Sequence, residues 1–193
     1  QHVLERIDLT RDLHFHTKTT IDTLDYSGEG LNSGSKVVFA AAGEKKRALA
    51  TELGFVMSSD FSAVKLAIPG VIALQLPAYT TAKAGKDEVA LLEEALKGKD
   101  LSGIPLIVLC DDAEFTAQNI NNLVWVTFTR SNPATDIHGI SEFIDDKHWG
   151  CNGSLIIDAR KKPHHAPELL KVPEIEEKVN RLGENGASLF GVI

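Results

Sequence analysis

The stretch LIVLCDDAEFTAQNINNLVWVTFTRSNPATD, residues 106–136, decides the fold. It opens on an apolar run, residues 106–110, that ends abruptly at the acids Asp111 and Asp112. Such a run is typical of a buried parallel strand that meets the carboxyl edge of its sheet. Open α/β sheets bind ligands at that edge, so the two acids are candidate ligand-binding residues. Capping of the next helix explains the same acids and is the favoured interpretation.

The second half of this stretch is compatible with a strand or a helix. Residues 123–128 have strong strand propensity. However, apolar residues between positions 120 and 128 also recur at helical spacing, and alternation of strands with helices calls for a helix here. The sequence therefore predicts a helix over residues 117–130 that ends before Pro133.

Working outward, the same criteria predict the remaining elements. Strands are expected at residues 36–42, 71–76, 137–140 and 154–158, and helices at residues 44–53, 87–96 and 173–182. Strand and helix in alternation imply right-handed crossovers between parallel strands. The predicted fold class is α/β, a three-layer αβα sandwich with a mostly parallel, doubly wound sheet. Residues 1–34 are polar and rich in turn signals, which predicts an extended lead-in or linker before an α/β domain at 35–193.

Composition excludes several classes of partner. The net charge is −7 and the basic residues form no stripe, which argues against nucleic acid. No apolar run approaches the roughly 20 residues of a membrane span. The two cysteines are too few for a disulfide framework, so a reducing, cytoplasmic compartment is expected. The chain begins at Gln1 rather than Met, which suggests an experimentally chosen start, a processed product or a piece of a longer chain.

Four acids are the main candidates for chemistry. Asp111, Asp112, Asp136 and Asp158 could gather at one sheet edge and hold Mg²⁺ or Mn²⁺. Helix capping and salt bridges to Arg130 and to Lys161 are favoured instead. Arg130 could also anchor a carboxylate or phosphate, although a pair with Asp136 is the favoured interpretation. A zinc site built from His138, His148, His164 and His165 has little support in the spacing.

Several pieces of this sequence, in order, resemble the C-terminal domain of the UbiD family of prenylated-FMN-dependent decarboxylases. They are Cys110-Asp111-Asp112, Asn122-Leu123-Val124-Trp125, Thr129-Arg130, Pro133 with Asp136, and the segment GSLIIDARKK at 153–162. Ala113, Asn132 and Arg160 depart from the family's usual residues.

The resemblance implies that this chain is part of a longer carboxy-lyase. The family's prenylated FMN, bound with a divalent metal and potassium, and its catalytic residues belong to a central domain upstream, which nothing in residues 1–193 matches. The chain would then be inactive alone, would pack against that flavin-binding domain and would help to build a homo-oligomer. No catalytic residue, cofactor or metal ligand is expected within it. Six positions are expected as family motif and interface: Asp111, Asp112, Thr129, Arg130, Asp136 and Asp158.

Two other interpretations remain open on the residues alone. One is a stand-alone α/β protein with a divalent-metal or small-ligand site at the acidic edge. The other is a non-catalytic oligomerisation module, for which the apolar tail at residues 186–193 is the best feature.

Overall fold

A five-stranded sheet forms the centre of the computed structural model, which describes residues 1–22, 25, 27–28, 30, 32–58, 61, 63–166 and 172–192. The strand order is β3 (Ala63–Ile68), β4 (Val71–Gln75), β5 (Leu106–Cys110), β9 (Leu155–Asp158) and β6 (Ile137–Gly139). The three inner strands are parallel, as predicted, whereas both outer pairs are antiparallel. The α/β class is thus confirmed, with a mixed sheet rather than a mostly parallel one.

The antiparallel edge at β3 follows from a tight turn. Strands β3 and β4 are joined only by Pro69 and Gly70, and a connection that short can only reverse the chain. Gly70 has φ of +79°, a conformation in which glycine carries no steric cost.

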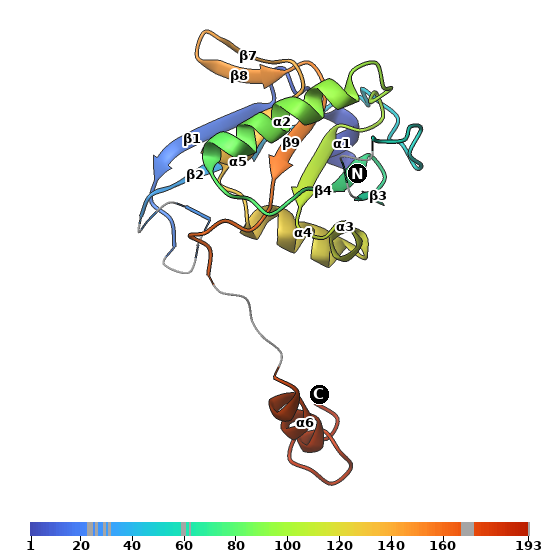
Figure 1. Cartoon of the computed structure of the whole chain (residues 1–193), viewed down its shortest axis with the longest axis vertical. Helices are drawn as coiled ribbons and strands as arrows, with labels where there is room; N and C mark the ends of the chain where they lie inside the picture. Colours follow the sequence, from blue (N-terminus) through green and yellow to red (C-terminus); the bar gives the residue numbers. More distant parts are fainter. Residues whose placement is uncertain are drawn as a thin grey trace.

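Helices cover both faces of the sheet (Figure 1). Helix α2 (Ala82–Leu96) buries Val89, Leu92 and Leu96 on one face. Helices α3 (Ala113–Ala117) and α4 (Ile120–Thr129) lie on the other face. Successive residues of β4 and β5 point alternately into these two layers, as the pleat of a strand requires.

Helix α4 confirms the helix predicted over residues 117–130. Asn119 caps it, because its side-chain oxygen accepts from the Asn122 amide at 2.9 Å. Leu123, Val126 and Thr127 are buried along one side. Burial of this side therefore outweighs the strand propensity of the same residues.

The first part of the chain packs into the body. Helix α1 (His2–Arg6) leads to β1 (Leu13–Thr19), which pairs antiparallel with β2 (Gly34–Phe39). Ile7, Leu9 and Leu13 are buried in one cluster with residues of β8 (His148–Cys151) and β9. The stretch expected as an extended lead-in thus contributes to the core, while a domain boundary at residue 34 stays a prediction.

The helix predicted over residues 44–53 is wrong. This segment makes backbone bonds to distant parts of the chain, with Ala50 donating to the Gly103 carbonyl at 2.8 Å and accepting from the Gly70 amide at 2.9 Å. These bonds replace the helical i to i−4 pattern. The hairpin of β7 (Glu142–Asp145) and β8, and strand β3, were not predicted at all.

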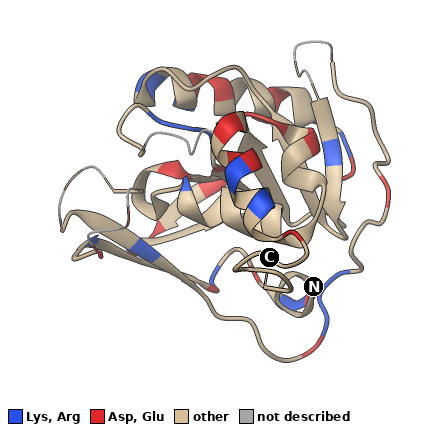
Figure 2. Cartoon of the chain, turned by 90° about the horizontal axis from the view of Figure 1, so that it is seen from below, with Lys and Arg blue, Asp and Glu red and all other residues tan. Residues whose placement is uncertain are grey.

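Helix α6 (Pro173–Leu182) confirms the last predicted helix and buries none of its side chains. Figure 1 draws it away from the α/β body. Acidic and basic residues are interspersed along the elements in Figure 2. Within the described part of the chain, no helix has the length and apolar character needed to cross a bilayer.

Candidate functional site

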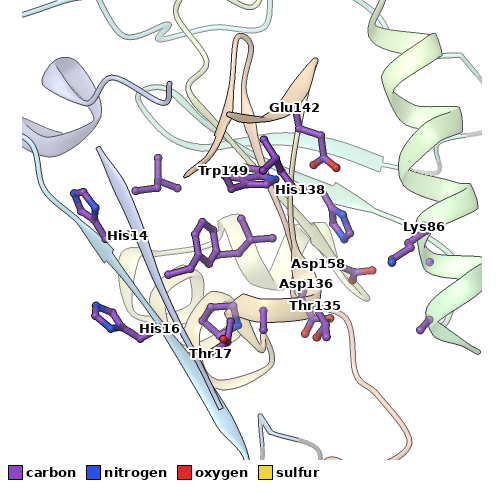
Figure 3. A pocket seen from close by; sticks show the side chains of 18 of the residues that line it. His14, His16, Thr17, Lys86, Thr135, Asp136, His138, Glu142, Trp149 and Asp158 are labelled. Carbon is purple, nitrogen blue, oxygen red and sulfur yellow. The ribbon is translucent and has the colours of Figure 1, made fainter. Parts of the chain in front are cut away.

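A cavity of about 780 Å³ opens beside the carboxyl end of β9. Its walls come from β1, the first half of α2, the short helix α5 (Pro133–Asp136) with β6, and the β7–β8 hairpin (Figure 3). The cavity thus lies at the edge of the sheet where ligands of α/β proteins bind. Of the four candidate acids, Asp136 and Asp158 line it, and Asp111 and Asp112 do not.

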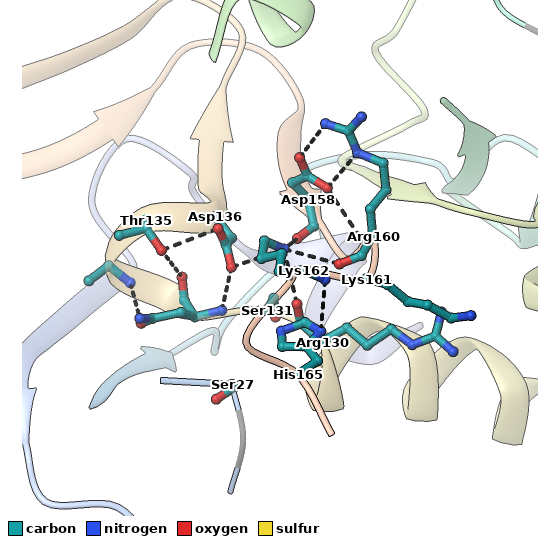
Figure 4. Close-up of polar contacts among 12 residues, drawn as sticks. Ser27, Arg130, Ser131, Thr135, Asp136, Asp158, Arg160, Lys161, Lys162 and His165 are labelled. Atoms are coloured by element: carbon teal, nitrogen blue, oxygen red, sulfur yellow. Dashed lines mark hydrogen bonds and ion pairs between the residues drawn. The ribbon is translucent and has the colours of Figure 1, made fainter. Parts of the chain in front are cut away.

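Asp158 is held in a two-point contact by Arg160 (Figure 4). Arg160 Nε lies 3.0 Å from Asp158 Oδ1, and Nη2 lies 2.7 Å from Oδ2. Burial alone would raise the pKa of this carboxyl, but the hydrogen bonds of Arg160 and the charges of Lys162 and Arg160 bring the pKa below its usual value. Asp158 is therefore ionised, and Arg160 binds both of its carboxylate oxygens.

Arg160 also connects three elements. Its Nη1 lies 2.7 Å from Glu88 Oε2 on α2 and donates to the Pro77 carbonyl at 2.8 Å. Its guanidinium carbon is 5.4 Å from the centre of the Tyr79 ring, which lines the cavity. This fully buried arginine therefore fixes one cavity wall to the end of β9.

Asp136 pairs with a buried lysine. Its Oδ2 lies 3.2 Å from Lys162 Nζ and accepts from the Asn132 amide at 2.7 Å. Burial raises the pKa of Asp136 despite the nearby lysine charge. Lys162 Nζ also donates to the carbonyls of Asp158 at 2.8 Å and Arg130 at 3.1 Å. The pairing of Arg130 with Asp136 predicted from the sequence is therefore wrong, because Lys162 fills that position.

The other motif residues serve the loops around β5. Asp111 Oδ2 lies 3.1 Å from Arg130 Nη1 and accepts from the Lys161 amide at 2.9 Å. Asp112 caps α3, and the Thr129 hydroxyl donates to the Trp125 carbonyl at 2.6 Å. Capping and salt bridging, the favoured interpretation of Asp111 and Asp112, is confirmed.

The four acids are thus divided among separate contacts instead of forming one ligand set. Among the described residues, no three His, Cys, Asp or Glu side chains are grouped so that they could hold a metal ion. Neither the proposed magnesium site nor the proposed zinc site is formed there.

The other cavity residues are not predicted as a group from the sequence. They include His14, His16, Lys86, His138, Glu142, Lys147, His148 and Trp149. These residues are spread over more than 130 positions and have no motif spacing, so only the folded chain brings them together. The number of histidines is the sole feature of the sequence that points to such a site.

His138 is a half-buried histidine of the cavity wall. Burial lowers the pKa of its imidazole, and the negative charges of Glu142, Asp158 and Asp136 only partly oppose that effect. The imidazole is therefore neutral at pH 7. Figure 3 places it between the carboxylates of Glu142 and Asp158.

The fold and the site together define an α/β domain. The acids of its sequence motifs bind the loops at the sheet edge, and polar side chains that could bind a ligand line its cavity. The family described as 3-octaprenyl-4-hydroxybenzoate carboxy-lyase C-terminal domain matches residues 1–41. A protein of Chlamydia pneumoniae, named as a subunit of 4-hydroxybenzoate decarboxylase, is 30% identical over 178 residues, which are 92% of this chain and 29% of that protein. An uncharacterized protein of Chlamydia trachomatis is 32% identical over 167 residues, 86% of this chain and 27% of that protein.

The chain is thus assigned to the UbiD family as a C-terminal domain, which confirms the resemblance predicted from the motifs. It spans less than a third of the length of these relatives. The solved structure of a vanillic acid decarboxylase of Sedimentibacter hydroxybenzoicus in an open form is 18% identical to this chain, with a TM-score of 0.33. The match covers 64% of this chain and 30% of that one, and no conclusion is drawn from it.

Proposed function

We propose that this chain is the C-terminal domain of a longer UbiD-like decarboxylase and forms one wall of its substrate pocket. The observation that carries the proposal is the cavity beside β9, which is lined by polar side chains that could bind a ligand. Its two buried acids, Asp158 and Asp136, are already paired with Arg160 and Lys162. Such a cavity can hold a ligand, but the reacting groups have to come from elsewhere. The name of the Chlamydia pneumoniae relative supports an aromatic carboxylic acid such as 4-hydroxybenzoate as the substrate.

Prenylated FMN, with a divalent metal and potassium, is proposed for the upstream part of the parent protein. Two features of the described residues support this placement of the group upstream. The buried cations nearest the cavity, Arg160 and Lys162, are already bound by carboxylates and carbonyls and have no place for a flavin phosphate. The oxygen ligands that a divalent metal requires are not grouped among the described side chains either.

The chain alone is therefore expected to be inactive. Purified residues 1–193 should release no CO₂ from 4-hydroxybenzoate and should carry no flavin absorbance after expression in cells that make prenylated FMN. The matched sample is the longer polypeptide from the same cells, which should show both. One flavin per molecule on the chain alone would refute the proposal that the flavin binds to the upstream part of the parent protein.

A role in assembly is a second proposal, and helix α6 is its basis. Ile175, Val179 and Leu182 follow one another at helical spacing and are all exposed. Phe190 and Val192 add exposed apolar surface just beyond the helix. We propose that α6 and the tail contact another protomer of a homo-oligomer. Cys110 and Cys151 are both free thiols, which supports a cytoplasmic location.

A further inference from the structure

Two asparagines of this chain are each followed by a glycine, Asn152 by Gly153 and Asn185 by Gly186. In such a pair the amide nitrogen of the glycine can attack the side-chain carbonyl of the asparagine. The glycine favours this attack, because it has no Cβ to hinder the approach and its backbone adopts many conformations. The same reaction is therefore possible at two places in the chain, and their surroundings differ.

Asn152 is held by hydrogen bonds on its side chain and on its backbone. Its Nδ2 donates to the Ser141 carbonyl at 3.2 Å, and its amide donates to the same carbonyl at 3.3 Å. The attacking atom is also occupied, because the Gly153 amide donates to the Ile140 carbonyl at 3.0 Å. An added Cβ at Gly153 would lie 2.7 Å from Ile140 Cβ, so this glycine is closely packed as well. Attack at Asn152 therefore requires these bonds to break first.

Asn185 lies in an open turn between α6 and the tail. The Ala187 amide donates to the Glu184 carbonyl at 2.9 Å, and the φ of +87° at Gly186 fits the third position of a type II turn. Such a turn uses only its outer carbonyl and its outer amide, and the Gly186 amide between them forms no hydrogen bond with a described residue. The Asn185 side chain forms none with the described residues either, and both residues are exposed. Nothing in the described fold therefore opposes the attack here.

We propose that Asn185 is a site of spontaneous deamidation in the folded chain and that the fold protects Asn152. The Gly186 nitrogen forms a bond to Asn185 Cγ, the bond from Cγ to Nδ2 breaks, and the proton of the Gly186 amide leaves with Nδ2 as ammonia. Water then opens the resulting cyclic imide at one of its two carbonyls and leaves an aspartate or an isoaspartate. Water is the sole co-reactant.

The product adds a negative charge at the bend between two apolar surfaces. The Leu189 amide donates to the Leu182 carbonyl at 2.9 Å, so the tail turns back toward the end of α6. Asn185 lies in this bend, and the helix and the tail that it joins both expose apolar side chains. A charge that enters an apolar contact without a partner costs free energy. Deamidation should therefore weaken assembly, an effect that rests on the proposed role of α6 and the tail.

Incubation of the folded chain tests the modification. The chain is kept dilute, because assembly through the tail would cover Asn185, and the pH is mildly alkaline. Mass spectrometry of proteolytic peptides then follows Asn152 and Asn185 over time. We expect Asn185 to react at least about tenfold faster than Asn152, because hydrogen bonds of typical strength have to break before Asn152 can react.

The same chain unfolded in urea is the matched control. Unfolding removes the hydrogen bonds around Asn152, so the two asparagines should then react at similar rates. Two variants assign the ammonia that the folded chain releases. Asn185→Gln should remove most of it, because the longer side chain closes the cyclic imide more slowly, and Asn152→Gln should leave the release unchanged.

Equal rates at the two sites of the folded chain, no reaction at Asn185, or a slower Asn152 in urea would each overturn the proposal. Sedimentation tests the effect on assembly separately. At equal concentration, Asn185→Asp should form less of the assembled particle than Asn185→Gln, and equal assembly of the two would overturn that effect. If the parent chain does not assemble at all, the proposed role of the tail fails while the deamidation rates are unchanged, so the two failures differ.

Discussion

Arg160 and Asp158, two residues apart at the end of β9, form a closed two-point ion pair inside the protein, with N–O distances of 3.0 and 2.7 Å. The same guanidinium reaches Glu88 on α2 and the carbonyl of Pro77. One arginine therefore joins the carboxyl edge of the sheet to the helix that covers it.

Replacing this arginine should destabilise the fold strongly. In Arg160→Leu, Asp158 keeps its buried charge but loses its main partner, which typically costs about 3–5 kcal/mol. Urea unfolding followed by circular dichroism measures the loss. The control is Arg181→Leu, which breaks only the exposed pair with Glu177 and should cost less than about 1 kcal/mol. Equal losses in the two variants would contradict the role of Arg160.

Acid should weaken the fold through His165. Burial, with the charges of Lys162, His164 and Arg130, lowers the pKa of His165 to about 4. Unfolded histidine titrates near 6.5, so between these values the unfolded chain binds more protons than the folded chain. Stability should therefore fall as the pH decreases from about 6.5 to about 4.

The variant His165→Gln isolates this effect. It should flatten the pH dependence of the urea midpoint in that window relative to the parent chain. His164→Gln, at the exposed neighbour, is the control and should leave most of the slope in place. If His165→Gln keeps the full slope of the parent, other groups cause it.

A methyl group at Gly85 should disturb the cavity wall. The Cβ of Gly85→Ala would lie 2.9 Å from the Tyr79 ring and 3.7 Å from Asp158 Oδ2, so the ring has to move. Overpacking of this kind typically costs about 1–3 kcal/mol. Gly54→Ala is the control, because nothing lies within 4 Å of its added Cβ. Thermal unfolding should give a lower melting temperature for Gly85→Ala than for Gly54→Ala. Equal melting temperatures would show that the Tyr79 ring moves aside without loss of stability.

Removing residues 186–193 should change assembly without changing the fold. Helix α6 buries none of its side chains, and Phe190 and Val192 are exposed, so the core loses no contact. If α6 and the tail contact another protomer, sedimentation should show a smaller particle with an unchanged circular dichroism spectrum. A truncated chain that keeps its original mass in solution would exclude the tail as the contact.

The sequence predicted the parts of the fold that local patterns determine. The inner strands β4, β5 and β9 are continuous apolar runs, and α2 and α6 have helical periodicity, so these elements were found. Residues 44–53 were mistaken for a helix, because their backbone partners lie near residues 70 and 103 and leave no local signal. Strand β3 is joined to β4 by a two-residue turn, so it does not follow the alternation of strands and helices from which the other strands were predicted.

The candidate site was predicted less completely than the fold. The motif acids were correctly interpreted as caps and ion-pair partners at Asp111 and Asp112. The partner of Asp136 was missed, because a buried lysine 26 positions later has no sequence signal that distinguishes it from a surface lysine. His138 stands alone in the sequence and gains its cavity position only from the pairing of β6 with β9.

Reconstitution tests the central claim most directly. The upstream part of the parent protein, produced without residues 1–193, is loaded with prenylated FMN, and CO₂ release from 4-hydroxybenzoate is measured before and after this chain is added. We predict little release from the upstream part alone and a clear, saturable increase on addition of the chain. Full release without the chain would contradict a role for this domain in the substrate pocket.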